Sequence, residues 1–117
     1  MPVINISNGT IEEIVREREN TLVTVTYRGK PGERRREQTV RLVVNMRTII
    51  LNAKGMPVKV SALREGMTIN ASFSSNLTRS IPPQAVAYVI RIVRRPMPDQ
   101  FTTGRILNID RRERSES

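Results

Sequence analysis

Arginine gives this sequence its chemical character. The sequence contains seventeen arginines and three lysines but only eleven acidic residues, so the formal net charge is +9. Guanidinium groups bind phosphate and carboxylate oxygens in a two-pronged geometry, and a surface of this charge attracts polyanions in a salt-dependent way. The competing interpretation is an arginine-rich codon bias combined with solubility.

The first basic group lies on one expected hairpin and comprises Arg28, Lys30, Arg34, Arg35 and Arg36. Pro31-Gly32 is a strong reverse-turn pair, and the charges around it cannot be buried. A bound polyanion would relieve the repulsion between these cations, so we predict a polyanion-binding site here. The alternative is a solvated loop that Glu33 and Glu37 partly neutralise.

The second basic group follows the last strand predicted for the main domain and comprises Arg91, Arg94 and Arg95. Four further arginines, at positions 105, 111, 112 and 114, continue the basic character toward the C-terminus. We include Arg91, Arg94 and Arg95 in the predicted polyanion site. A tail that serves only to keep the chain solvated is the alternative.

The residue types argue against catalysis. The chain has no histidine and no cysteine, which removes the usual general base, the thiol nucleophile, disulfides and the commonest zinc ligands. Its serines have no histidine partner, and no G-x-S-x-G or G-x-x-x-x-G-K motif is present. We therefore predict a protein that is not an enzyme, with no catalytic residue, metal or cofactor.

Two arrangements of carboxylates could still challenge that prediction. Glu12 and Glu13 are neighbours, and successive residues of a strand point to opposite faces, so we expect them not to form a pair. Glu65 could meet Asp99 or Asp110 only if folding brought them together, and nothing in the sequence favours that pairing.

The elements that must position the basic groups are strands. Hydrophobic residues alternate with polar ones at 22–27, and similar patterns predict strands over 9–15, 38–44, 48–51, 67–73 and 85–93. The first of these begins at the turn signal Asn8-Gly9, and residues 57–60 are expected to pair with 48–51 across a turn. Residues 61–66 form the expected helical turn, with Ser61 as its cap and Gly66 as its stop.

The aromatic residues are few and fall on hydrophobic positions. Only Tyr27, Phe73, Tyr88 and Phe101 are aromatic, so the core must be aliphatic. In the segment 85–93, alternation places Val86, Tyr88, Ile90 and Ile92 on one face. We expect Tyr27 and Tyr88 to belong to the core rather than to a platform that stacks bases.

The domain organisation follows from the prolines. Residues 1–95 form one predicted barrel domain, in which 74–84 is a polar loop closed by Pro82-Pro83. Residues 96–117 form a proline-broken basic tail that ends in a disordered segment. A weak match between the starts of segments 9–16 and 104–111 raises the alternative that 104–110 adds one more strand.

Several motifs together resemble a known kind of domain. They are an opening G-x-I-x-x-I, the segment TIILNAKGMPV, the segment S-x-L-x-x-G-M, and Pro-Pro-Gln-Ala-x-Ala-x-x-Ile, with Leu63, Gly66, Met67, Ala85, Ala87 and Ile90 as the most specific positions. Over residues 9–94 the chain resembles small bacterial barrel domains of the oligonucleotide/oligosaccharide-binding (OB) type, often of unknown function. The resemblance implies a mainly β fold, a small OB-like antiparallel barrel of roughly five to seven strands with at most one short helical turn.

Two functional hypotheses follow. The first is a non-catalytic binding or interaction module that meets nucleic acid or another polyanion through its arginine-rich loops. The second is a structural or assembly domain that pairs with a protein partner or with itself through edge strands or the tail. No window approaches the apolar length of a membrane helix, and the N-terminus lacks a basic leader, so we expect no membrane partner and a cytoplasmic location. An exported parent or a trimmed leader is the alternative.

Overall fold

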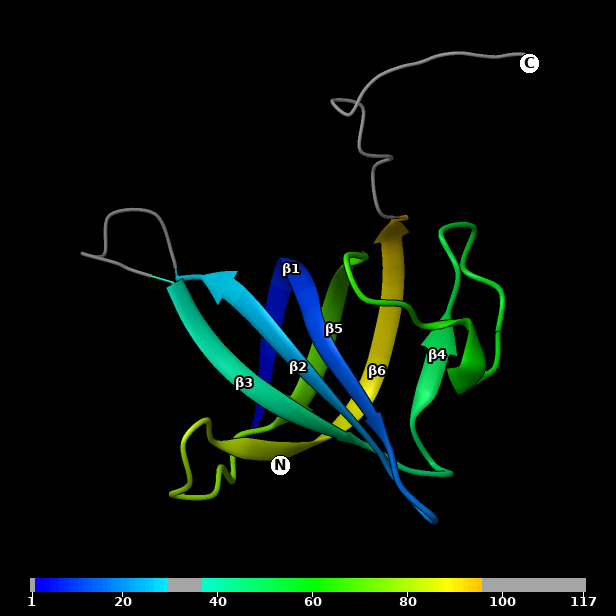
Figure 1. Cartoon of the computed structure of the whole chain (residues 1–117). Coiled ribbons are helices and arrows are strands. Elements are labelled where there is room, and N and C mark those ends of the chain that lie inside the picture. Colours follow the sequence, from blue (N-terminus) through cyan, green and yellow to red (C-terminus); the bar gives the residue numbers. More distant parts are fainter. Residues whose placement is uncertain (1, 30–36, 96–117) are drawn as a thin grey trace, which may run out of the picture.

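Strands dominate the computed structural model, which describes residues 2–29 and 37–95 (Figure 1). The described residues form six strands and one short 3₁₀ turn, η1 (Val60–Ala62). The strands are β1 (Val3–Arg16), β2 (Thr21–Arg28), β3 (Glu37–Val44), β4 (Ile49–Leu51), β5 (Thr68–Ser74) and β6 (Gln84–Arg94). The predicted mainly β class with almost no helix is confirmed. The predicted tail, with its strand at 104–110, lies outside the described residues.

The strands pair into a ring. Neighbours follow the order β3-β2-β1-β5-β6-β4, and a further pairing of β3 with β6 closes the circuit β1-β2-β3-β6-β5. The predicted antiparallel arrangement holds for β1–β2, β2–β3, β1–β5 and β5–β6, but β6 runs parallel to both β3 and β4. Alternation assigns residues to faces but does not say which distant strands meet, so these parallel pairs could not be derived from it.

β1 is longer than predicted because Asn8-Gly9 bends the strand instead of starting it. Its first half pairs with β5 and its second half with β2, with a register shift between Ile6 and Gly9. Asn8 adopts φ of 56°, and its backbone N–H donates to Oδ1 of Asn70 at 2.9 Å. A bend of this kind lets one strand serve two neighbours that point in different directions.

A second irregularity in β1 corrects the prediction for the two glutamates. The register shifts between Ile11 and Glu13, which leaves Glu12 as the extra residue of a bulge. Glu12 and Glu13 are therefore both exposed and do not alternate between the two faces. Glu12 accepts a hydrogen bond of 2.7 Å from the Thr26 hydroxyl.

A bulge also changes the faces of β6. Ala85 and Ala87 point inward, whereas Val86 and Tyr88 are 40% and 37% exposed. The register then shifts, and Ile90 and Ile92 are buried. The prediction that Val86 and Tyr88 share the buried face was wrong, because strict alternation fails where a bulge inserts a residue. Tyr27 is half-buried against the core.

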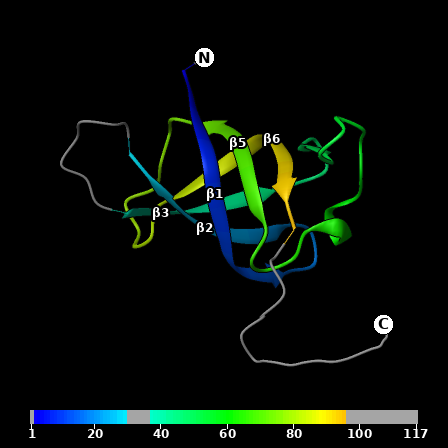
Figure 2. The same ribbon diagram turned by 90° about the horizontal axis from the view of Figure 1, so that it is seen from above.

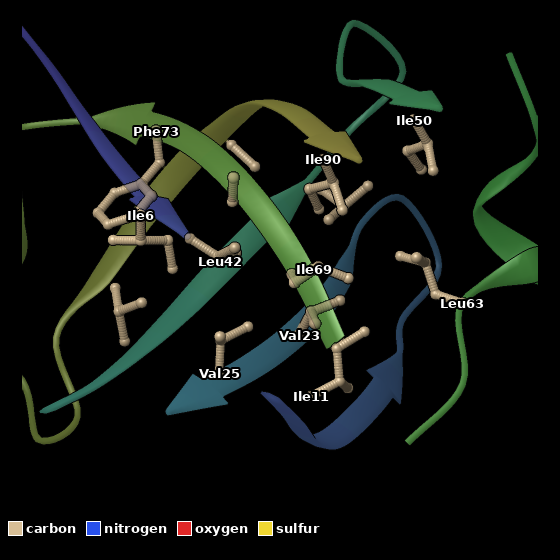
Figure 3. Close-up of a cluster of buried hydrophobic side chains, with 14 of the residues drawn as sticks. Ile6, Ile11, Val23, Val25, Leu42, Ile50, Leu63, Ile69, Phe73 and Ile90 are labelled. Atoms are coloured by element: carbon tan, nitrogen blue, oxygen red, sulfur yellow. The ribbon is translucent and has the colours of Figure 1, made fainter. Parts of the chain in front are cut away.

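The core lies between strands that cross each other. Seen from above, β1 and β5 run across the direction of β3, as in orthogonal sheet packing (Figure 2). Buried side chains from all these strands point into the space between them (Figure 3). Phe73, Ile69, Ile90 and Leu42 are fully buried, and each contributes about 1.5–3 kcal/mol through burial. The predicted aliphatic core is confirmed for the described residues, among which Phe73 is the one buried aromatic side chain.

The connection from β4 to β5 closes one end of the ring. Leu63 is fully buried there, and the backbone N–H of Gly66 donates a hydrogen bond of 2.8 Å to the carbonyl oxygen of Ile11 in β1. The predicted helical turn is only the 3₁₀ turn η1, and Ser61 does not cap it, since Lys59 holds the N-cap position without a side-chain bond. The segment 57–60 was expected to pair with 48–51. In the structure, Pro57 forms an isolated β-bridge with Leu51, and the backbone N–H of Val58 donates a hydrogen bond to the carbonyl oxygen of Ile50.

Candidate anion-binding site

The site begins with the turn after β4, at residues 52–55. The Oδ1 atom of Asn52 accepts hydrogen bonds from the backbone N–H groups of Lys54 at 2.9 Å and Met56 at 3.0 Å. Gly55 has φ of 83°, a backbone conformation that glycine adopts without steric cost. These contacts fix the shape of the turn and therefore the position from which Lys54 extends.

Arg91 holds this turn against β6. Its Nη2 atom donates to the carbonyl oxygen of Ala53 at 2.9 Å, and Arg91 itself is the register partner of Leu51 in the parallel pair. The guanidinium that the sequence assigned to ligand binding is thus partly engaged in positioning the turn. Arg91 is otherwise an exposed residue of β6.

A cavity of about 340 Å³ lies between this turn and the end of β6. Three cationic side chains line it, those of Lys54, Arg94 and Arg95, together with the amide of Asn52. No carboxylate belongs to the described lining of this cavity. Its other lining residues are apolar: Ala53, Val58, Ala62, Met67, Ile92 and Val93.

This arrangement suits an anion. Three like charges at one cavity repel each other, and an anionic group placed among them would relieve that repulsion. Arginine can grip two oxygens of a phosphate at once, while the lysine ammonium acts as a point charge. Lys54, Arg94 and Arg95 are exposed, so salt will screen their attraction for an anion.

The structure places only part of the two basic groups predicted from the sequence. Arg28 lies exposed at the end of β2, where its register partner is Glu37. Lys30, Arg34, Arg35 and Arg36 lie outside the described residues. The structure brings Arg94 and Arg95 together with Lys54, which sequence reasoning missed. The only sequence signal for Lys54 was the predicted turn Asn52-Ala53-Lys54-Gly55. The parallel pairing of β4 with β6, which brings that turn beside Arg94 and Arg95, was not evident from the sequence.

A larger cavity of about 760 Å³ lies along the bend of β1 and the end of β2. Its lining includes Arg28 and Glu37, which carry opposite charges, and Tyr27. The Tyr27 hydroxyl donates to Oε1 of Gln38 at 3.3 Å, and burial raises the pKa of Tyr27. Because its charges are of both signs, this cavity is a weaker candidate for an anion than the one beside β6.

Within 2–29 and 37–95, no three acidic side chains gather where they could hold a metal ion. No helix in that part of the chain is long and apolar enough to cross a membrane. Comparison with protein-family models, with curated proteins and with solved structures found no match.

Proposed function

We propose that this protein is a non-catalytic binding module for a polyanion, with a nucleic acid as the favoured ligand. The observation that carries the proposal is the cavity at the end of β6, where Lys54, Arg94 and Arg95 gather and no carboxylate is among the lining residues described. The net charge of +9 adds a long-range attraction for any polyanion.

The strand connectivity supports an OB-like barrel as the fold of this module. β1 bends to join two neighbours, the ring closes through the parallel pair of β3 with β6, and a short turn fills the connection before β5. OB barrels commonly bind oligonucleotides and oligosaccharides. Of the aromatic residues that the structure describes, only Tyr88 is exposed on the outer surface, so charge rather than base stacking should supply most of the affinity.

The test is the binding of a fluorescein-labelled single-stranded DNA, followed by fluorescence anisotropy at about 50 mM salt. Replacing Lys54, Arg94 and Arg95 together by glutamine should weaken binding by at least about tenfold. Each phosphate contact that is lost means that fewer counterions are released from the DNA on binding, and this release drives association. The matched control replaces three exposed arginines of other loops, Arg18, Arg47 and Arg79, which changes the net charge equally.

Three outcomes would contradict the proposal. One is the absence of binding by the unaltered protein at low salt. Another is an equal loss in the cavity variant and the control variant, which would reduce the effect to net charge. The third is a loss confined to a variant with Arg34, Arg35 and Arg36 replaced, which should leave thermal stability unchanged and would transfer the site to the hairpin.

A second candidate function is assembly through a strand edge. β3 pairs with β6 only over residues 41–43, while Glu37, Gln38 and Thr39 are exposed ahead of that ladder. An exposed edge of this kind can accept a strand from another chain. Sedimentation of the full chain and of a version ending at Arg95 tests this function. Two strict monomers would argue against both edge pairing and assembly through the tail.

A further inference from the structure

The register of four neighbouring strands aligns a row of apolar side chains on the outside of the sheet. Val15 of β1 pairs with Leu22 of β2, Leu22 with Val43 of β3, and Val43 with Val86 of β6. The residues on both sides of Leu22, Val43 and Val86 are buried, and Ile14 beside Val15 packs against the core, so this row points outward. Val15 and Val86 are each 40% exposed, and Leu22 and Val43 are half-buried.

A polar row runs beside the apolar one, two residues away in each strand. It consists of Glu13, Thr24, Arg41 and Gln84, which are also register partners. Nε of Arg41 donates to the Thr24 hydroxyl at 3.5 Å. Glu13 on β1 and Arg41 on β3 are both register partners of Thr24, so two opposite charges lie at the same height on the two sides of β2.

We propose that this face, defined by the rows Val15–Leu22–Val43 and Glu13–Thr24–Arg41, is the interface between two copies of the chain. The copies are related by a two-fold axis that runs parallel to β2 and over it. Such an axis keeps each height along the strands and exchanges the two sides of β2. It therefore places Leu22 against the partner's Leu22 and Val15 against the partner's Val43.

The same axis pairs the charges. Glu13 comes to face the partner's Arg41, and Arg41 comes to face the partner's Glu13, so one symmetry operation forms two ion pairs. Two sheets that pack face to face lie about 10 Å apart, a gap that the long side chains of glutamate and arginine can span together. A face that complements itself in this way meets the requirement for a closed two-fold dimer.

The charge pattern favours a second copy over the polyanion as the occupant of this face. The carboxylates of Glu12 and Glu13 are both exposed at its β1 side and would repel phosphate groups. Lys54, Arg94 and Arg95 are not part of either row, so the dimer and the proposed anion site are independent claims. Each can fail without the other.

Light scattering and sedimentation velocity over a range of protein concentrations test the proposal. The unaltered protein should show a monomer–dimer equilibrium that shifts toward dimer as concentration rises. Leu22→Lys should be monomeric at all concentrations, since it sets two ammonium groups against each other at the axis. A matched control, Ile49→Lys, alters a hydrophobic residue that is 52% exposed outside the two rows and should leave the dimer intact.

Charge reversal gives the sharpest test. Glu13→Arg alone sets arginine against arginine, and Arg41→Glu alone sets glutamate against glutamate, so each variant should dimerise at least about tenfold more weakly. Mixing the two variants should restore a heterodimer, because both ion pairs can then form, one with its charges exchanged and the other as in the unaltered dimer. Circular dichroism and thermal unfolding of each variant check that it is folded. An unaltered protein that stays monomeric, or a mixture that stays as monomeric as its parts, would overturn the proposal.

Discussion

Gly9 lies so close to Val25 that a Cβ atom at position 9 would be 2.7 Å from Cγ1 of Val25. Both residues are buried, and Gly9 follows Asn8 at the bend of β1. The missing side chain is therefore what allows the bent strand to approach β2 at this point. Val25 cannot retreat without displacing the rest of the core, because its own exposure is 0%.

Gly9→Ala should therefore destabilise the protein by about 1–3 kcal/mol through overpacking. Urea unfolding followed by circular dichroism measures this change. In a background that carries Val25→Ala, the same substitution should cost clearly less, because the conflicting methyl group has been removed. An equal cost in both backgrounds would show that contact with Val25 is not the cause. Ser7→Ala, at an exposed position of the same strand, is the control.

Among the described residues, Phe73 of β5 is the largest fully buried side chain, and it packs beside Ile6 in the core (Figure 3). Phe73→Ala should cost about 3–5 kcal/mol, because the surrounding strands can collapse only partly onto the vacated space. Phe73→Leu should cost less, since it retains most of the apolar volume. Unfolding midpoints in urea rank the two variants. If Phe73→Ala cost no more than Val3→Ala, at a position that is 43% exposed, this description of the core would be wrong.

Asn52 is the residue that shapes the turn carrying Lys54. Asn52→Ala removes the acceptor for two backbone N–H groups, and we expect a loss of about 1 kcal/mol in stability. Binding of single-stranded DNA should weaken as well, because the lysine is no longer held beside Arg94 and Arg95. Asn76→Ala, in the exposed loop before β6, should alter neither property. Unchanged affinity in Asn52→Ala would separate the turn from the binding site.

Tyr27 should titrate above the ordinary tyrosine pKa of about 10, because burial raises its pKa. The chain has only two tyrosines, so absorbance of a Tyr88→Phe variant at alkaline pH follows Tyr27 alone. The folded state holds this proton more tightly than the unfolded state does. The free energy of unfolding should therefore fall as pH rises from about 10 through the pKa of the folded protein.

That contribution to the pH dependence should disappear in Tyr27→Phe, which keeps the ring and lacks the ionising hydroxyl. The reference is the titration of the same Tyr88→Phe variant unfolded in urea. A midpoint in the folded protein that equals or lies below this reference would contradict the effect of burial.

The amino-acid sequence alone determined the mainly β class and most strand positions. Alternation of residues such as Val23 and Val25 with threonines depends only on the pleat of a strand, so it is visible without any knowledge of neighbours. The turns at Asn52-Ala53-Lys54-Gly55 and at Gly66 were likewise evident from local chemistry. The absence of histidine and cysteine limited the chemistry that the chain could perform.

Only the tertiary structure decided what depends on contacts between distant strands. The bend at Asn8-Gly9 and the bulges in β1 and β6 changed the faces of Glu12 and Tyr88, because a bulge is stabilised by the partner strand and leaves no local pattern. The parallel pairing of β4 with β6 brought Lys54 to Arg94 and Arg95. The physical reason is the same in each case: local periodicity sets which way a side chain points, whereas strand register sets which side chains meet.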